Sequence, residues 1–142
     1  MTGWFFGQET VRTAVDNEHA LLRGIRHDLC LDLAAEAPVF LEQPVDYADL
    51  EGLAEAKKPV PLPAGACECA LTIQDMMRVI RMDACDFFNF KVDRLGGIYK
   101  GKQAIGMINA AGKWALLSGQ ISIGVGATAR SHFSAATCSL FP

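Results

Sequence analysis

The sequence has no excess of basic residues. Its 13 lysines and arginines are outnumbered by 16 aspartates and glutamates, which gives a formal net charge of −3. The two signs are scattered along the chain, whereas nucleic acids and anionic membranes are usually bound by a basic patch or a polybasic segment. We therefore expect neither nucleic acid nor a membrane among the partners of this chain.

Long apolar runs are missing as well. The N-terminal stretch 1–10, MTGWFFGQET, is too short and too interrupted by polar residues to be a signal peptide or a membrane span. We predict that residues 1–10 are an extension and that residues 11–142 form one domain. A chain of 142 residues, 51% of them hydrophobic, is long enough to bury a sizeable core.

Cysteine is present in an odd number, and no secretory signal precedes it, so we expect reduced thiols in a cytoplasmic protein. Cys67 and Cys69 could be half of a zinc site, but no second cysteine pair or neighbouring histidine completes the set. Composition favours buried thiols that fill space in the core. The five cysteines are Cys30, Cys67, Cys69, Cys85 and Cys138.

The sequence does contain an alternation of short apolar runs and helical patterns. Residues 39–41 lead into Glu42, residues 60–66 into Cys67 and Glu68, and residues 87–90 into Lys91. Buried parallel strands are continuously apolar, and their last residues emerge where ligands bind. The pattern predicts a parallel α/β fold. Its further strands are expected at 11–16 and 114–117, and its helices at 18–37, 47–57, 72–82, 100–111 and 127–137.

Two of these elements carry detailed predictions. Prolines at 59, 61 and 63 would remove hydrogen-bond donors from a sheet, so we expect a short strand that enters only near residues 62–66. In the helix at 72–82, Thr72 is the expected N-cap. The apolar residues expected to form the buried stripe of this helix are Met76, Met77, Val79, Ile80 and Met82.

Three carboxylates recur at a constant spacing. Asp16, Glu42 and Glu68 follow one another at intervals of 26 residues, about one strand–helix unit. Side chains so placed would converge at one end of a barrel and suit a hard cation such as Mg²⁺. Lys91 ends the next strand, where a nearby dication would disfavour its ammonium form and let it act as a base. Taken singly, each carboxylate could instead cap a helix, and Lys91 could be a solvated loop residue.

Residues 11–138 resemble the barrel domain of the mandelate racemase/muconate-lactonizing enzymes of the enolase superfamily. The motifs that carry the resemblance are VD at 15–16, FLEQP at 40–44, DLEGLAE at 49–55 and NFKVDRLGG at 89–97. The resemblance implies a partial TIM (β/α)8 barrel covering about strands three to seven. It also implies that Asp16, Glu42 and Glu68 bind Mg²⁺ and that Lys91 is the acid/base.

The chain departs from the family pattern at several points. Cys67 occupies the place of a usual aspartate, which leaves Glu68 as the oxygen donor there. Asn17 directly follows Asp16, where D-x-N is usual. The family's second-strand lysines, its N-terminal lid domain and its last barrel strand have no counterpart in these 142 residues.

The activity implied by the resemblance is that of a Mg²⁺-dependent lyase or isomerase. Such an enzyme abstracts the proton α to the carboxylate of a small acid, such as an amino acid, a hydroxyproline or a sugar acid. Racemisation needs a second base, so dehydration or cycloisomerisation is easier to reconcile with the residues present. The alternative is a truncated, catalytically inert barrel fragment or a self-associating scaffold. Because open barrel edges are unpaired, we also expect a homo-oligomer.

Overall fold

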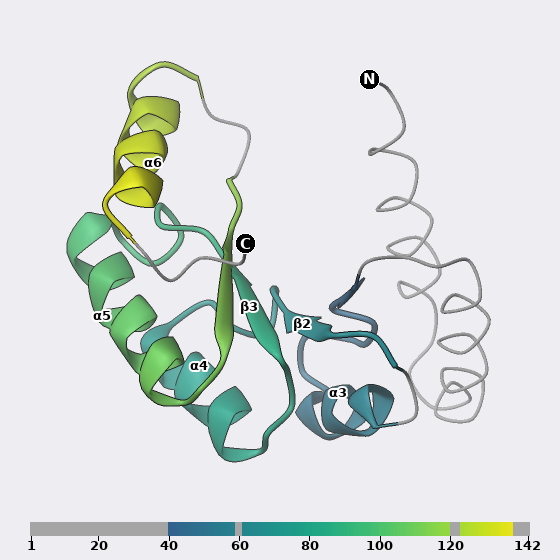
Figure 1. The fold of residues 1–142 in the computed structure, drawn as a ribbon. Helices are drawn as coiled ribbons and strands as arrows, with labels where there is room; N and C mark the ends of the chain where they lie inside the picture. The colour runs from purple at the N-terminus through teal and green to yellow at the C-terminus, as the bar shows by residue number, and fades with distance from the viewer. Residues whose placement is uncertain (1–39, 59–60, 120–122, 138–142) are drawn as a thin grey trace.

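Strands and helices alternate along the chain in the computed structural model, which describes residues 40–58, 61–119 and 123–137 (Figure 1). None of the described helices is long and apolar enough to cross a membrane. The strand predicted at 11–16, the helix predicted at 18–37 and the predicted boundary after residue 10 lie outside the described residues. In chain order the elements are β1 (Leu41–Glu42), α3 (Leu50–Lys57), β2 (Ala64–Ala66), α4 (Ile73–Arg81), β3 (Phe87–Phe90), α5 (Ile98–Ala110), β4 (Trp114–Leu117) and α6 (Val125–Ala135).

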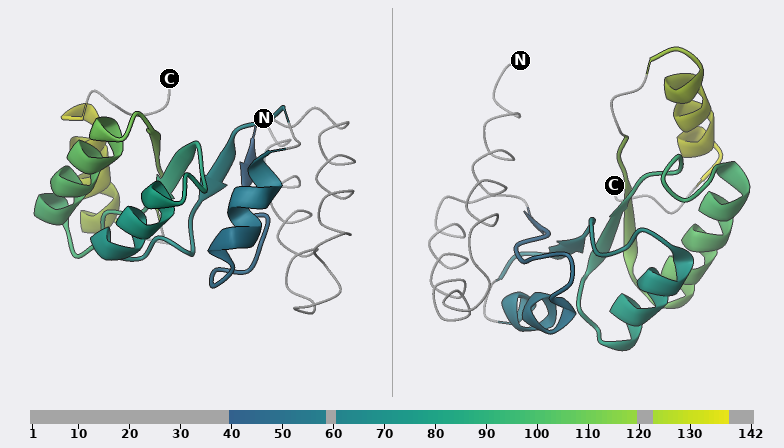
Figure 2. Two further views of the ribbon diagram at one scale, coloured as in Figure 1. Left: turned by 90° about the horizontal axis from the view of Figure 1, so that it is seen from below. Right: turned by 180° about the vertical axis from the view of Figure 1, so that it is seen from behind.

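The four described strands form one parallel sheet in the order β1-β2-β3-β4. The register pairs Leu41 with Ala64, Gly65 with Phe87, and Phe87 with Trp114. Helices α3, α4 and α5 connect successive strands and lie on one side of the sheet (Figure 2). A parallel sheet covered on one side by its own crossover helices is the wall of a (β/α)8 barrel. The predicted α/β fold, part of such a barrel, is therefore confirmed.

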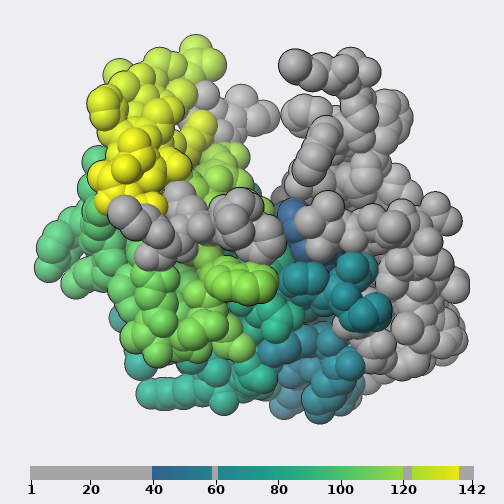
Figure 3. Space-filling view, viewed as in Figure 1, coloured from purple at the N-terminus to yellow at the C-terminus, as the bar shows by residue number. Residues whose placement is uncertain are grey.

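The two faces of the sheet have different roles because successive side chains of a strand point to opposite sides. Leu41, Ala66 and Phe88 belong to the hydrophobic core that the strands share with the helices. On the face seen in the space-filling view, the described residues from α3 to α6 form one continuous surface (Figure 3). Phe87 lies on the opposite face, where its ring meets that of Phe40 edge-on at 5.0 Å between centroids.

Local sequence patterns determine where several elements begin and end. Strand β2 has three residues, and the prediction that the prolines would keep it short is confirmed. Thr72 caps α4, as the sequence predicts, and its side chain and that of Asp75 form a reciprocal capping box. Asp49 caps α3 by accepting a hydrogen bond from the backbone of Gly52.

The predicted buried stripe of α4 is partly wrong. Met76 and Val79 are fully buried, but Met77 and Met82 are 39% and 40% exposed. A helix turns by about 100° per residue, so positions 76 and 79 share a face from which position 77 points away. Long apolar side chains occur at protein surfaces often enough that hydrophobicity alone does not place them inside.

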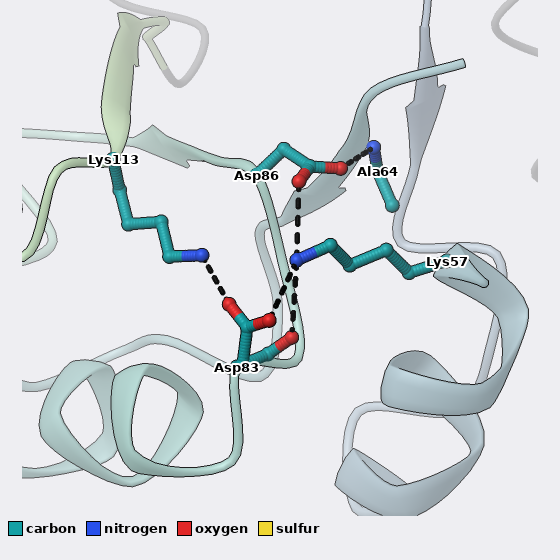
Figure 4. A network of polar contacts seen from close by, with 5 residues as sticks. All are labelled: Lys57, Ala64, Asp83, Asp86 and Lys113. Atoms are coloured by element: carbon teal, nitrogen blue, oxygen red, sulfur yellow. Dashed lines mark hydrogen bonds and ion pairs between the residues drawn. The ribbon is translucent and has the colours of Figure 1, made fainter. Parts of the chain in front are cut away.

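An ion network ties the amino ends of three strands together (Figure 4). Lys57, at the end of α3, lies 3.1 Å from a carboxylate oxygen of Asp83 and 3.1 Å from one of Asp86. Asp86 also accepts a hydrogen bond of 2.9 Å from the backbone of Ala64 in β2. Lys113, just before β4, pairs with Asp83. The network thus connects α3 with strands β2, β3 and β4 at the amino ends of these strands.

Candidate metal and catalytic site

Polar side chains follow three neighbouring strands at the carboxyl end of the sheet. Glu42 is the last residue of β1, Cys67 and Glu68 come directly after β2, and Lys91 comes directly after β3. Because these strands are parallel and adjacent, their carboxyl ends lie along one edge. We call Glu42, Cys67, Glu68 and Lys91 the strand-end cluster.

The structure brings two of the predicted metal ligands together. One carboxylate oxygen of Glu42, one of Glu68 and the Sγ atom of Cys67 all lie within 4.8 Å of one another. Both glutamates are half-buried and Cys67 is buried. Asp16, the third predicted ligand, lies outside the described residues. The described donor atoms are close enough together that they could hold one divalent cation.

Lys91 lies beside the same group of atoms. Its side chain is half-buried, and its Nζ atom lies 4.0 Å from Sγ of Cys67. The predicted acid/base therefore faces the centre of the cluster. Two residues earlier in β3, Asn89 is buried, and its Oδ1 atom accepts no hydrogen bond within the part of the chain that the structure describes.

Gln43 positions the cluster, and the sequence prediction missed this role. Its Oε1 atom accepts hydrogen bonds from the backbone N–H groups of Cys67 at 3.0 Å and Cys69 at 3.3 Å. Its own N–H donates to the carbonyl of Gly65 at 2.8 Å, and its backbone has a φ of 43°, unusual for a residue with a side chain. Such a conformation persists where the surrounding structure enforces it. The sequence signal for this role was that Gln43 is a polar residue directly after an apolar strand. That pattern does not distinguish a residue that positions the ligands from a ligand itself.

The cysteines of the described residues are buried and unpaired, as composition predicts. Burial raises the pKa of the Cys67 thiol to about 12, and the carboxylates of Glu42 and Glu68 act in the same direction while the Lys91 ammonium opposes them. Burial likewise raises the pKa of Cys69 to about 11 and that of Cys85 to about 12. These are neutral thiols at physiological pH. Cys30 and Cys138 lie outside the described residues.

Taken together, the sheet and the acidic residues at its strand ends define a section of a (β/α)8-barrel domain with a candidate cation site. The family model for enolase C-terminal domain-like proteins matches residues 6–141, and the chain belongs to this family. The predicted resemblance to the mandelate racemase/muconate-lactonizing enzymes is thereby confirmed.

Characterised relatives include two kinds of isomerase. The chain is 33% identical over 96 residues to an L-Ala-D/L-Glu epimerase of Clostridium acetobutylicum, a match that covers 68% of this chain and 27% of that protein. It is also 33% identical over 96 residues to muconate cycloisomerase 1 of Rhodococcus opacus, covering 68% of this chain and 26% of that protein. The matches therefore span about a quarter of the length of these relatives.

A solved structure gives the same picture of the fold. The dipeptide epimerase of Enterococcus faecalis, in complex with Mg and the dipeptide L-Leu-L-Tyr, superposes with a TM-score of 0.78 at 25% sequence identity. The superposition covers 83% of this chain and 34% of the epimerase. The chain thus corresponds in fold to about one third of an intact enzyme.

Proposed function

We propose that this chain carries the acid/base and metal-binding edge of an enolase-superfamily site, which removes the proton α to the carboxylate of a small acid. The observation that supports this most is the strand-end cluster, in which carboxylate oxygens of two glutamates and the sulfur of Cys67 lie within 4.8 Å of one another and the Lys91 amine lies 4.0 Å from that sulfur. Relatives that act as epimerases and cycloisomerases support the same class of chemistry.

Glu42 and Glu68 would hold the cation, with Asp16 as a further ligand. Their carboxylates fit Mg²⁺, which prefers oxygen donors, whereas the sulfur of Cys67 does not fit such a set. When bound, the cation would stabilise the negative charge that develops on the substrate carboxylate. In the proposed arrangement the substrate is a carboxylic acid small enough to sit between the two glutamates and Lys91.

Lys91 would remove or return the α-proton. It comes from the strand next to that of Cys67 and Glu68, so it approaches the ligand from a fixed side of the cluster. Proton transfer by one base on one face retains the configuration of the α-carbon, whereas epimerisation needs a second base on the opposite face. We therefore propose exchange or elimination with a single base, as in dehydration or cycloisomerisation, as the activity of the residues in this chain.

A second candidate is an inert barrel section that folds without catalysing a reaction. Two observations favour it: the match covers 27% of the length of the Clostridium epimerase, and Cys67 stands in the group of donor atoms. This alternative predicts a folded chain that binds no Mg²⁺ in a saturable way.

Mg²⁺ calorimetry and proton exchange separate the two candidates. We expect saturable Mg²⁺ binding, together with exchange of the α-proton of dipeptides or other α-substituted acids in D₂O with retained configuration. Lys91→Ala should slow this exchange by about 10²–10⁴-fold, because a general base contributes that much. Lys58→Ala, at an exposed residue of α3's C-cap, is the matched control.

Absence of saturable binding at millimolar Mg²⁺ in the folded chain would support the inert barrel section. Exchange that proceeds equally fast in the Lys91→Ala variant would remove this lysine from the mechanism.

A further inference from the structure

The strand-end cluster contains a sulfur atom among its donors. Sγ of Cys67 lies within 4.8 Å of carboxylate oxygens of both Glu42 and Glu68. In a tetrahedral site the donor atoms lie about 2.0–2.3 Å from the zinc ion, which places them roughly 3.3–3.8 Å from one another. The three donor atoms would therefore have to approach one another by up to about 1.5 Å to bind a single zinc ion, a shift that rotation of the glutamate side chains can supply.

The position of the sulfur is fixed by the backbone around it. The side-chain oxygen of Gln43 accepts hydrogen bonds from the backbone N–H groups of Cys67 and Cys69. These bonds attach the turn after β2 to the residue that follows β1. Cys67 is 1% exposed, so its side chain has little room to turn away from the cluster. Ligands held in place before a cation arrives bind it more tightly than mobile ones.

A buried side-chain oxygen of β3 has no hydrogen-bond partner among the residues that the structure describes. Asn89 is 6% exposed, and within the described residues its Oδ1 atom accepts no hydrogen bond. The register pairs Gly65 with Phe87 and Ala66 with Phe88, so its continuation by one residue places Asn89 beside Cys67. Buried acceptors are normally satisfied. An O–H or N–H group of a bound ligand could donate the hydrogen bond that the Oδ1 atom of Asn89 does not receive from the described residues.

We infer that Cys67 is itself a metal ligand and that this site takes a thiophilic divalent cation of the zinc class in preference to Mg²⁺. The inference rests on the proposed function, because it assigns Glu42 and Glu68 to the same cation. Thiolate sulfur favours Zn²⁺ and similar ions, whereas Mg²⁺ is bound through oxygen. Coordination releases the thiol proton to the solvent, so that the sulfur binds as a thiolate.

A higher affinity for Zn²⁺ than for Mg²⁺ does not by itself test this inference, because Zn²⁺ binds more tightly than most divalent ions to sites of any ligand composition. The probe is therefore Co²⁺, which replaces zinc and gives a near-ultraviolet charge-transfer band when sulfur is a ligand. We expect a saturable band with one Co²⁺ per chain, displaced by Zn²⁺. Cys67→Ser should abolish the band. Cys69→Ser, at a buried thiol of the same turn, should retain it.

Cys67→Asp supplies the second measurement. Replacing sulfur by a carboxylate should weaken Zn²⁺ binding and strengthen Mg²⁺ binding, each by about 10–100-fold. Circular dichroism of every variant checks that the fold is retained. If the original chain binds Mg²⁺ and Co²⁺ without a sulfur band, the inference is overturned while the proposed function stands. If the folded chain binds no divalent cation, both fail.

Discussion

Gly65 shows how a single residue makes room on the inner face of the sheet. A Cβ atom at this position would lie 2.2 Å from the ring of Phe87, which is 1% exposed and cannot move into solvent. Gly65→Ala should therefore destabilise the fold by about 1–3 kcal/mol through overpacking. Urea unfolding followed by circular dichroism measures the difference in the free energy of unfolding.

Gly106→Ala is the matched control for this substitution. Gly106 lies in the interior of α5, and a Cβ atom there would meet nothing within 4 Å. Alanine favours the helix over glycine, so this variant should gain about 0.5–1 kcal/mol. Equal stability of the two variants would contradict the packing argument.

At the same scale, the sequence predicted where the candidate residues lie better than how they are held in place. That Glu42, Glu68 and Lys91 lie close together could be predicted because each follows an apolar run, and parallel strands bring such residues to one edge. The role of Gln43 could not be predicted, because it depends on a left-handed backbone conformation and on contacts between its side chain and two N–H groups in the turn after β2. Local sequence contains no information on such a contact between segments.

Among the elements, the ion network at the amino ends of the strands makes stability depend on pH. Burial works against the charge of Lys57, but hydrogen bonds and charge from Asp83 and Asp86 outweigh it and raise the pKa of Lys57 above 10.5. Hydrogen bonds from Lys113 and Lys57 lower the pKa of Asp83 below 3.8. Stability from Lys57 is therefore present below pH 10.5 and lost as the pH rises through its folded-state pKa. The stabilisation from Asp83 is present above pH 3.8 and is lost as the pH falls through the folded-state pKa of Asp83.

Lys57→Met tests this network. Near neutral pH the variant should lose about 1–2 kcal/mol, since Lys57 is largely buried while Asp83 is 70% exposed and contributes little. The deficit should shrink below pH 3.8 and above pH 10.5, where the unmodified chain loses the same interactions. Chemical unfolding at a series of pH values gives both results. Lys58→Met, at the neighbouring exposed lysine, is the control and should show no such dependence on pH. If the stability that Lys57→Met loses is the same at every pH, the loss comes from packing and not from the ion network.

Element boundaries followed from local chemistry where capping and proline govern them. The short β2 and the capping box of Thr72 and Asp75 depend on residues next to one another in sequence. The exposure of Met77 and Met82 was not predictable in this way, because it depends on how α4 is rotated against the sheet. That rotation is set by contacts with other elements.

At the scale of the whole molecule, the described strands make up an open part of a barrel. Among them, β4 pairs with β3 on one side, and β1 and β4 are the two ends of the sheet. Trp114, the first residue of β4, is 50% exposed and lies in register with Phe87. A strand at the edge of a sheet that also exposes a large apolar side chain favours association with another chain.

We expect this chain to self-associate through β4. Sedimentation velocity should show species heavier than one chain that increase with concentration. Trp114→Lys places a charge at the edge, and a buried tryptophan at an interface contributes more than 1.4 kcal/mol, so the concentration for half-association should rise at least about tenfold. Tyr99→Lys, at an aromatic residue 76% exposed on α5, should leave association unchanged. A single species with the mass of one chain at every concentration would show that the edge is covered within the chain itself.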